Sequence, residues 1–327
     1  MTFYGGFTYI GRVRPGRGRA TDGAKVKKRR GRWWEDQLDQ FLQLAINGLA
    51  LGCIYGLVAL GFVLVYKATE IVNFAQGDLM MLGAFMAYTF IATLGLDYWV
   101  GFIAGALVLG VFGIVVDRVV LRYIIGQPQF AMIMLTIGLG FLFRSAASMT
   151  WGPDDHSLPT PFTNKVVNVA GAVVSLEYIS IIVGTVVLCV VLYGFFRFTK
   201  LGVAMQAASQ NQLAAYYMGI PVKLIFSLIW GISAMVATVA GVLLAPVSLI
   251  QVNMGLLGLK AFAAAVLGGF GSIPGALVGG AIVGVIEVFS GVYLAEGFKD
   301  VAAYIVLLGV LVVRPQGLFG QLGRKKV

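Results

Sequence analysis

Three ionisable side chains, Asp78, Lys260 and Glu287, fall within apolar stretches or at their start, where a charge is costly. Glu287 lies near the middle of an apolar run, Lys260 opens a short one, and Asp78 ends a polar cluster with Asn73 and Gln76. Charged groups at membrane depth pair with one another or mark the path of a solute. We therefore consider two roles for each residue: it lines a translocation path, or it forms a structural ion pair or hydrogen bond. The long side chain of Lys260 could also reach the membrane–water interface.

The chain lacks the sequence patterns of nucleotide hydrolysis and of common enzymes. It contains no G-x-x-x-x-G-K-[ST] loop, no H-E-x-x-H and no G-x-S-x-G motif. Its two cysteines, Cys53 and Cys189, lie in separate apolar runs, and its single histidine, His156, has no second ligand near it in sequence. Neither a disulfide framework nor a metal site is indicated. We predict no catalytic residue, no metal site and no cofactor bound by this chain. If ATP powers transport by this protein, another chain must hydrolyse it.

The most distinctive stretch is KAFAAAVLGGFGSIPGALVGGAIVG, from Lys260 to Gly284. Two rows of small residues recur there at every fourth position: Gly271, Gly275 and Gly279, and Ala276, Gly280 and Gly284. Such rows let helix backbones touch in lipid and favour a packing seam. Pro274 interrupts the helix, and irregular backbone at membrane depth must be buried in protein or line a wet cavity. We predict a tight corner between helices or part of a permeation path. The candidate residues are Gly268, Gly269, Gly271, Ser272 and Gly275.

A polar segment, LGVAMQAASQNQLAAYYMGIPVK from Leu201 to Lys223, separates two apolar runs. It is too polar to span a membrane, and its centre contains few helix breakers. Gly219 followed by Pro221 is typical of a helix end. We predict one short exposed helix over residues 204–220, which is either an ordinary interfacial helix or a lever that docks another subunit.

The composition requires a membrane protein: 59% of the 327 residues are hydrophobic, 12% are charged, and the mean hydropathy is +0.90. Nine apolar runs are candidates for membrane helices. They cover residues 40–66, 78–95, 99–121, 129–148, 178–196, 224–248, 258–270, 276–295 and 301–318. We predict an all-α polytopic fold with about eight or nine transmembrane helices, of which the second and the short seventh are broken or re-entrant elements.

Basic residues are concentrated at the N-terminus. Residues 1–33 carry ten Lys or Arg and one Asp, so they account for +9 of the net charge of +10. We predict that residues 1–37 are a disordered cytoplasmic tail that anchors the topology beside anionic lipid, in preference to a nucleic-acid-binding arm. Lys and Arg also follow the third and fifth runs and end the chain in a basic segment, residues 321–327, which we expect on the same side.

Parity then constrains the first three runs. If the basic tail and Arg122 share a side, residues 40–122 cross the membrane an even number of times, although hydropathy gives three runs there. We expect the region 68–95 not to cross fully. The acidic loop WGPDDHSLPTPFTNK, which starts at Trp151, is expected outside.

Three stretches resemble one known family. They are Ile71-Val72-Asn73-Phe74-Ala75-Gln76-Gly77-Asp78, the segment AASQNQLAAYYMGI and the glycine-rich KAFAAAVLGGFGSIPGALVGG. They are similar to the permease subunits of branched-chain amino acid ABC importers, and the last of them is the most specific. The similarity covers about residues 38–320 in the family's order. The basic tail of residues 1–33 departs from the family pattern.

The resemblance implies a bacterial inner-membrane importer of leucine, isoleucine and valine, built with a second permease, two cytoplasmic ATPases that bind ATP and Mg²⁺, and a periplasmic solute-binding protein. No nucleic-acid partner is expected, and both termini are expected in the cytoplasm. Residues 204–220 match the coupling segment that docks on an ATPase. The residues implied in coupling are Ala208, Gln210, Asn211, Leu213, Ala214, Tyr217, Met218 and Gly219.

Two alternatives stay open at this point. Urea and short-chain amide importers share the permease architecture and similar motifs. A secondary transporter driven by an ion gradient would use Glu287, Asp78 and Lys260 as coupling charges, but it leaves residues 204–220 without a role.

Overall fold

The computed structural model describes residues 21–124, 127–169, 172–295 and 297–320. The chain divides into two units, residues 1–41 and 42–327. The first helix, α1 (Thr21–Thr69), begins inside the first unit, so residues 21–37 are helical where we expected a disordered tail. Lys and Arg are good helix formers, and no proline interrupts the segment. Residues 1–20 and 321–327 of the expected cytoplasmic tails lie outside the described residues.

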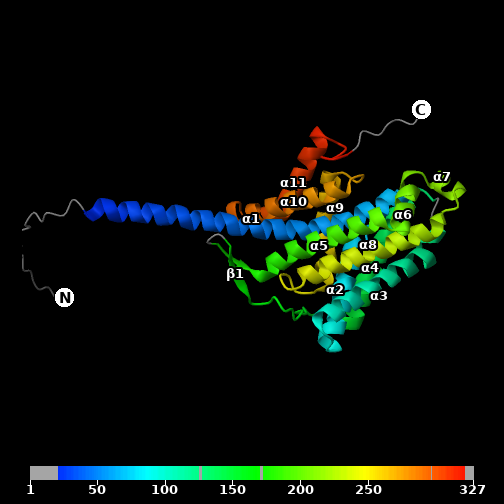
Figure 1. Ribbon diagram of the computed structural model, residues 1–327, viewed down its shortest axis with the longest axis horizontal. Coiled ribbons are helices and arrows are strands. Elements are labelled where there is room, and N and C mark those ends of the chain that lie inside the picture. The colour runs from blue at the N-terminus through cyan, green and yellow to red at the C-terminus, as the bar shows by residue number, and fades with distance from the viewer. Residues whose placement is uncertain (1–20, 125–126, 170–171, 296, 321–327) are drawn as a thin grey trace, which may run out of the picture. The chain divides into compact units, whose positions relative to one another are not determined.

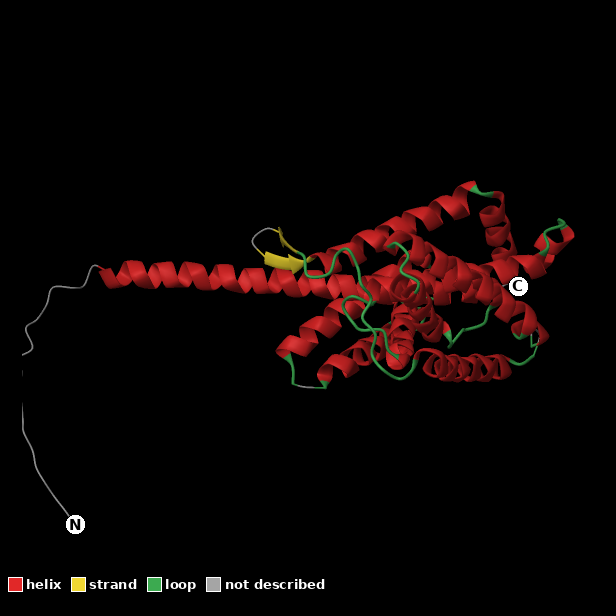
Figure 2. Cartoon of the chain, turned by 90° about the horizontal axis from the view of Figure 1, so that it is seen from below, coloured by secondary structure: helices red, strands yellow, loops and turns green. Residues whose placement is uncertain are grey.

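Helices make up almost all of the second unit (Figures 1 and 2). After α1 come α2 (Gln76–Tyr88), a π-helical turn (Thr89–Thr93), α3 (Tyr98–Val119), a 3-10 turn (Leu121–Tyr123) and α4 (Gln129–Trp151). A hairpin of β1 (Val166–Val169) and β2 (Ala172–Ser175) precedes α5 (Leu176–Phe198), α6 (Lys200–Gln210), α7 (Gln212–Tyr217) and α8 (Val222–Leu244). A 3-10 turn (Val252–Leu256), α9 (Leu257–Gly268), α10 (Ile273–Tyr293) and α11 (Phe298–Val313) complete the described chain.

Among the described residues, six helices are long and apolar enough to cross a membrane: Gln37–Thr69, Tyr98–Tyr123, Gln129–Trp151, Leu176–Phe198, Val222–Leu244 and Ile273–Tyr293. A helical polytopic membrane protein is confirmed, but the count of eight or nine spans is not. Each of the nine apolar runs does contain a helix. However, α2, α9 and α11 have only 13, 12 and 16 residues, fewer than the roughly 20 that span a hydrocarbon core.

Two ends of the helical bundle can be identified by the residues that meet there. The hairpin end contains the strands Val166–Ser175 and the start of α5; the α7 end contains α6, α7 and the start of α8. Gln43 on α1 donates to Val173 O at the hairpin end, at 3.0 Å; Figure 2 shows the strands beside this helix. On the same helix, Ala68 O accepts from Gln212 Nε2 at the α7 end, at 3.0 Å. Thus α1 runs from the hairpin end to the α7 end.

Arg122 lies at the α7 end, because its guanidinium donates to Ser227 Oγ near the start of α8, at 3.1 Å. Residues 43 and 122 therefore lie at opposite ends of the bundle, whereas an even number of crossings would place them at the same end. The physical reason is that α2 starts beside Gly61, eight residues before the end of α1, and not at the end itself. Gln76 packs against Gly61, so the 18 residues from Gln76 to the end of the π-helical turn return to the hairpin end. There Thr89 Oγ1 accepts from the Trp151 indole at 2.8 Å.

The described end of the chain lies at the α7 end. Backbone N–H groups of Leu318 and Phe319 donate to Leu267 O and Gly268 O, at 2.8 and 3.1 Å. These carbonyls end α9 beside the start of α10, where Ile273 lines a cavity together with Gln206 of α6. Gln43 and residue 320 are consequently at opposite ends of the bundle, while the two termini of the chain, which we expect in the cytoplasm, lie outside the described residues.

The two predicted rows of small residues on α10 pack against two different helices. Gly280 and Gly284 face α1, where a Cβ on Gly280 would collide with the backbone of Gly56, and a Cβ on Gly52 would lie 2.6 Å from Ala281 Cα. Gly275 and Gly279 face the backbone of α9. Close backbone approach thus fixes α10 between α1 and α9. Gly271 is outside the seam, since nothing lies within 4 Å of the position its Cβ would take.

The predicted break around Pro274 is a tight corner between α9 and α10. Gly269 takes a φ of +97°, which favours glycine. Ser272 Oγ then caps α10 by accepting from Gly275 N at 3.1 Å, and Pro274 sits in the first turn, where its missing N–H costs nothing. Backbone N–H groups of the segment that follows α11 donate to the last carbonyls of α9. These carbonyls of the irregular backbone therefore have hydrogen-bond partners.

Candidate functional site

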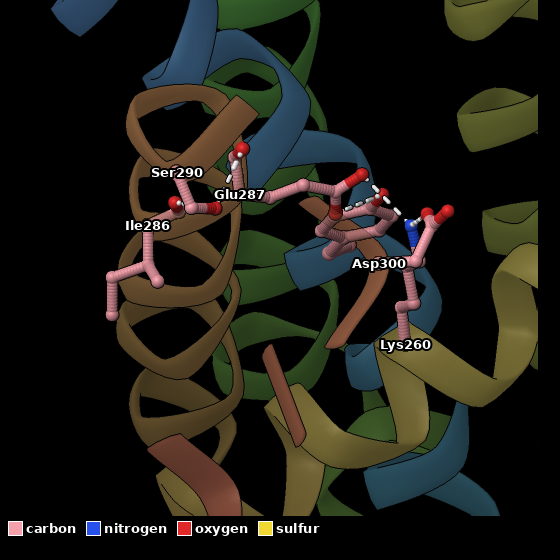
Figure 3. Close-up of polar contacts among 6 residues, drawn as sticks. Lys260, Ile286, Glu287, Ser290 and Asp300 are labelled. Carbon is pink, nitrogen blue, oxygen red and sulfur yellow. Dashed lines mark hydrogen bonds and ion pairs between the residues drawn. The ribbon is translucent and has the colours of Figure 1, made fainter. Parts of the chain in front are cut away.

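Lys260 and Glu287 meet in the structure, as the sequence suggested they could (Figure 3). Lys260 Nζ on α9 lies 2.8 Å from Glu287 Oε1 on α10 and 2.8 Å from Asp300 Oδ1 on α11. The hydroxyl of Tyr55, on α1, donates to the other oxygen of Glu287 at 2.7 Å. Four helices thus contribute one side chain each to a single network. Sequence reasoning missed two of these side chains, because Tyr55 is an ordinary residue of an apolar run and Asp300 lies just before one.

The members of this network differ in exposure. The Glu287 side chain is 3% exposed, Lys260 13% and Asp300 74%. One lysine with two carboxylates leaves a net charge of −1 at neutral pH. The buried pair between Lys260 and Glu287 needs both charges, since removing either would leave the other unpaired in a medium of low dielectric constant. The exposed arm from Lys260 to Asp300 contributes much less.

Asn73 and Gln76 form a second, fully buried polar cluster. Asn73 Nδ2 donates to Gln76 Oε1 at 3.1 Å, and Gln76 Nε2 donates to Ser233 O on α8 at 3.2 Å. Ser233 Oγ lies 3.0 Å from Gln76 Oε1 and 3.1 Å from Gly61 O. Asn73 Oδ1 accepts from Ala75 N, so Asn73 organises the start of α2, while Gln76 and Ser233 join it to α8 and α1. The cluster therefore anchors the broken helix.

Asp78 does not join the other two charges. Its Oδ1 accepts from Arg144 Nε on α4 at 2.6 Å, a partner that sequence reasoning did not propose. The buried carboxylate lies where α2 and α9 begin side by side: a Cβ on Gly77 would be 2.8 Å from Gly258 Cα. From this point α2 runs to the hairpin end and α9 to the α7 end. Helix N-termini favour negative charge, so the position of Asp78 has a structural explanation.

The polar segment after α5 forms two helices, α6 and α7, not the single helix predicted over residues 204–220. The chain leaves helical geometry at Asn211, with φ −155° and ψ 102°, and the Asn211 side chain accepts from Ala214 N at 3.0 Å. Asparagine competes well for backbone partners at a helix N-terminus, which explains the break. As predicted, the segment ends at Gly219, which has a φ of +80°. The bonds Gly219 N to Tyr216 O and Ile220 N to Ala215 O form a Schellman motif.

α7 projects large apolar side chains outward. Leu213, Tyr217 and Met218 are 63%, 77% and 83% exposed, and the neighbouring Gln210 and Ala214 are exposed as well. Ala208 differs from the other predicted coupling residues because it is fully buried against α1 and α8. Exposed apolar groups gathered on a short connecting element indicate a contact surface for another protein.

The remaining predicted residues are brought together at the α9–α10 corner. Gly268 packs against Gly275, and Ser272 N donates to Gly269 O at 3.0 Å. In the part of the chain that the structure describes, no three His, Cys, Asp or Glu side chains are grouped so that they could hold a metal ion.

Residues 44–313 match the family model for the permease component of branched-chain amino acid transport systems. The chain is 34% identical to the high-affinity branched-chain amino acid transport system permease protein LivH of Salmonella typhimurium, over 89% of this chain and 99% of that protein. It is equally identical to the BraD permease protein of Pseudomonas aeruginosa, with the same coverage of both chains. Among solved structures, PsaBC from Streptococcus pneumoniae in complex with Fab matches with a TM-score of 0.44 and 16% identity, covering 84% of this chain and 92% of its own. This chain belongs to the family of permease components of branched-chain amino acid transport systems.

Proposed function

We propose that this chain is the membrane-spanning permease subunit of an ATP-driven importer of branched-chain amino acids. The observation that carries the proposal is the identity of 34% to permeases of that transport system over nearly their whole length. The buried clusters around Glu287 and Gln76 join helices, so tight binding of the solute can reside in a separate binding protein while this chain supplies the path. In this scheme a second permease completes the translocation path, and a periplasmic binding protein delivers the solute. Two cytoplasmic ATPases, which bind ATP and Mg²⁺, supply the energy for transport.

The exposed apolar face of α7 is the surface on which we place an ATPase. An ATPase dimer that closes on ATP would favour one orientation of the two permeases through such a contact, which is a shift of populations between two states. This assignment puts the α7 end of the bundle in the cytoplasm of a bacterial inner membrane. Basic residues at that end agree with it: Arg118, Arg122, Arg197, Lys200 and Lys223. The hairpin end, with Gln43, then faces outward.

Purification of the tagged protein from its native host, followed by mass spectrometry, tests the assembly. We expect an ATPase and a second, related permease to copurify. Reconstituted with the binding protein in proteoliposomes, the complex should take up labelled leucine in an ATP-dependent manner, and isoleucine and valine should compete. If only urea or short amides competed with labelled leucine for uptake, the substrate would belong to that class of compounds instead. Uptake by the isolated chain without ATP would refute the ABC mechanism in favour of an ion-coupled one.

A matched pair of tyrosine variants tests the docking surface. Tyr217 on α7 and Tyr123 after α3 both lie at the α7 end and are 77% and 79% exposed. Tyr217→Arg places a charge in the proposed contact and should uncouple ATP hydrolysis from uptake, whereas Tyr123→Arg should leave both unchanged. Equal effects of the two substitutions would show that α7 has no special part in docking.

A further inference from the structure

The network around Lys260 combines one fixed partner with one that can be exchanged. Glu287 is buried and held in place by both Lys260 and the Tyr55 hydroxyl, at 2.8 and 2.7 Å. Among the described residues, Asp300 is held by Lys260 alone, at 2.8 Å, and 74% of its side chain is exposed. Water competes for the exposed Asp300 carboxylate, although the Lys260 side chain is only 13% exposed, so this bond contributes less than the buried one to Glu287. Another carboxylate could therefore replace that of Asp300 on Lys260 at small cost.

The charges of the network fit the head group of an α-amino acid. Lys260 offers an ammonium for the carboxylate of the solute, and the displaced Asp300, together with the negative field of Glu287, offers partners for the ammonium of the solute. The exchange adds no net charge to the site, since a zwitterion is neutral, and every charge keeps an opposite neighbour throughout. Urea and simple amides carry no such pair of charges and could not make the exchange.

The position of the network agrees with this use. Glu287 lies 14 residues after the start of α10 at the α7 end and 6 residues before its end, which places the network in the half of the bundle nearer the hairpin end. In the proposed orientation this half faces the binding protein. Exposed apolar side chains stand one helical turn from the charged groups, namely Leu256 before Lys260 and Tyr304 after Asp300. A branched aliphatic side chain would find apolar surface beside the charges.

We propose that Lys260, Asp300 and Glu287 form a transient recognition site for the zwitterionic head of the amino acid as it passes from the binding protein into the permease. The inference rests on the proposed function and specifies where in the chain that substrate is recognised. Lys260 binds the carboxylate, Asp300 exchanges between Lys260 and the ammonium of the substrate, and Tyr55 with Glu287 holds Lys260 in place.

The test uses the complete reconstituted importer and a photoreactive leucine that carries a diazirine on its side chain. The complex is loaded through the binding protein, stalled with a nonhydrolysable ATP analogue and irradiated, and the modified peptides are identified by mass spectrometry. We expect crosslinks in this chain within residues 252–268 and 298–313, and we expect unlabelled leucine to suppress them. Crosslinks confined to other segments would overturn the site.

Asp300→Asn tests the exchangeable arm without burying an unpaired charge, because the side chain is exposed. We expect it to raise the leucine concentration for half-maximal uptake by up to about fivefold, the factor that corresponds to 1 kcal/mol, and to weaken the crosslinks, with thermal unfolding unchanged. Asp154→Asn removes an exposed carboxylate from the loop between α4 and the hairpin and should change neither. Normal uptake and normal crosslinking by Asp300→Asn would refute the exchange. Failure of the unsubstituted complex to take up leucine would instead refute the proposed function.

Discussion

The two glycines Gly271 and Gly275 lie in the same four-residue row, yet the structure predicts opposite responses to alanine. A Cβ on Gly275 would lie 3.0 Å from Ser272 Cβ and 3.1 Å from the carbonyl carbon of Gly268, with the Gly268 oxygen closer still. Ordinary contacts of a Cβ lie at 3.4–4 Å. The end of α9 would have to move by on the order of 1 Å to restore normal contact. That movement would disturb the bond from Phe319 N to Gly268 O.

Forced overpacking of this kind costs about 1–3 kcal/mol, and replacing glycine by alanine in a helix recovers at most about 1 kcal/mol. We therefore expect Gly275→Ala to lose roughly 1–2 kcal/mol of stability, which for a chain of 327 residues corresponds to a fall in Tm of roughly 1.5–3 °C. Gly271→Ala is the control, because its Cβ would meet nothing within 4 Å and its φ is not positive.

The assay is thermal unfolding of the two variants in mild detergent, followed by size-exclusion chromatography of the fluorescently tagged protein. The expected result is a lower Tm and a smaller folded peak for Gly275→Ala, with Gly271→Ala close to the unsubstituted protein. Equal Tm values for all three proteins would refute the backbone seam between α9 and α10. A comparable loss in Gly271→Ala would mean that the whole row packs, contrary to the observed corner.

Three further substitutions test other contacts. Tyr55→Phe removes the hydroxyl that donates to Glu287 and should cost about 1.5–3 kcal/mol, as a hydrogen bond to a charged group does; an unchanged Tm would show that the bond contributes nothing. Arg144→Met leaves the carboxylate of Asp78 buried and unpaired and should cost about 3–5 kcal/mol, whereas adding Asp78→Asn should restore part of the loss, and no restoration would contradict the pairing. Asn211→Ala removes the cap of α7, worth about 1 kcal/mol, and should speed amide hydrogen exchange across this helix while α6 stays protected; equal exchange rates would argue against the cap.

Local sequence patterns identified the elements because the physical rules that govern them act over a few residues. Each of the nine apolar runs contains a helix, and the second and seventh, which were expected to be irregular, hold two of the three helices that are too short to span, the third being α11 in the ninth run. The end of α7 at Gly219 followed from glycine's access to positive φ. The break at Asn211 was missed because a polar side chain inside a helical pattern either faces solvent or caps a new helix, and spacing alone does not distinguish the two.

The partners of the buried charges depended on the tertiary structure. Lys260 and Glu287 are charges too costly to leave alone, so an ion pair was among the roles that the sequence predicted for each of them. Asp300, at a helix start, and Tyr55, in the middle of α1, carry no such signal, and both reach Glu287 or Lys260 only because α10 packs closely against α1 and α9. Likewise, Arg144 lies 66 residues from Asp78 and meets it only across packed helices.

The sequence by itself determined that this is a helical membrane protein of the branched-chain amino acid permease family, because hydropathy and local motifs do not depend on how the helices are arranged. The tertiary structure alone decided the direction of each helix and therefore which ends share a side. The parity argument from basic residues did not anticipate that residues 43 and 122 lie at opposite ends of the bundle. The chain returns from the end of α1 to the level of Gly61 before α2 begins, so the 13 residues of α2 cover only the rest of the distance to the hairpin end, and Gln76 and Ser233 satisfy the polar groups at the break.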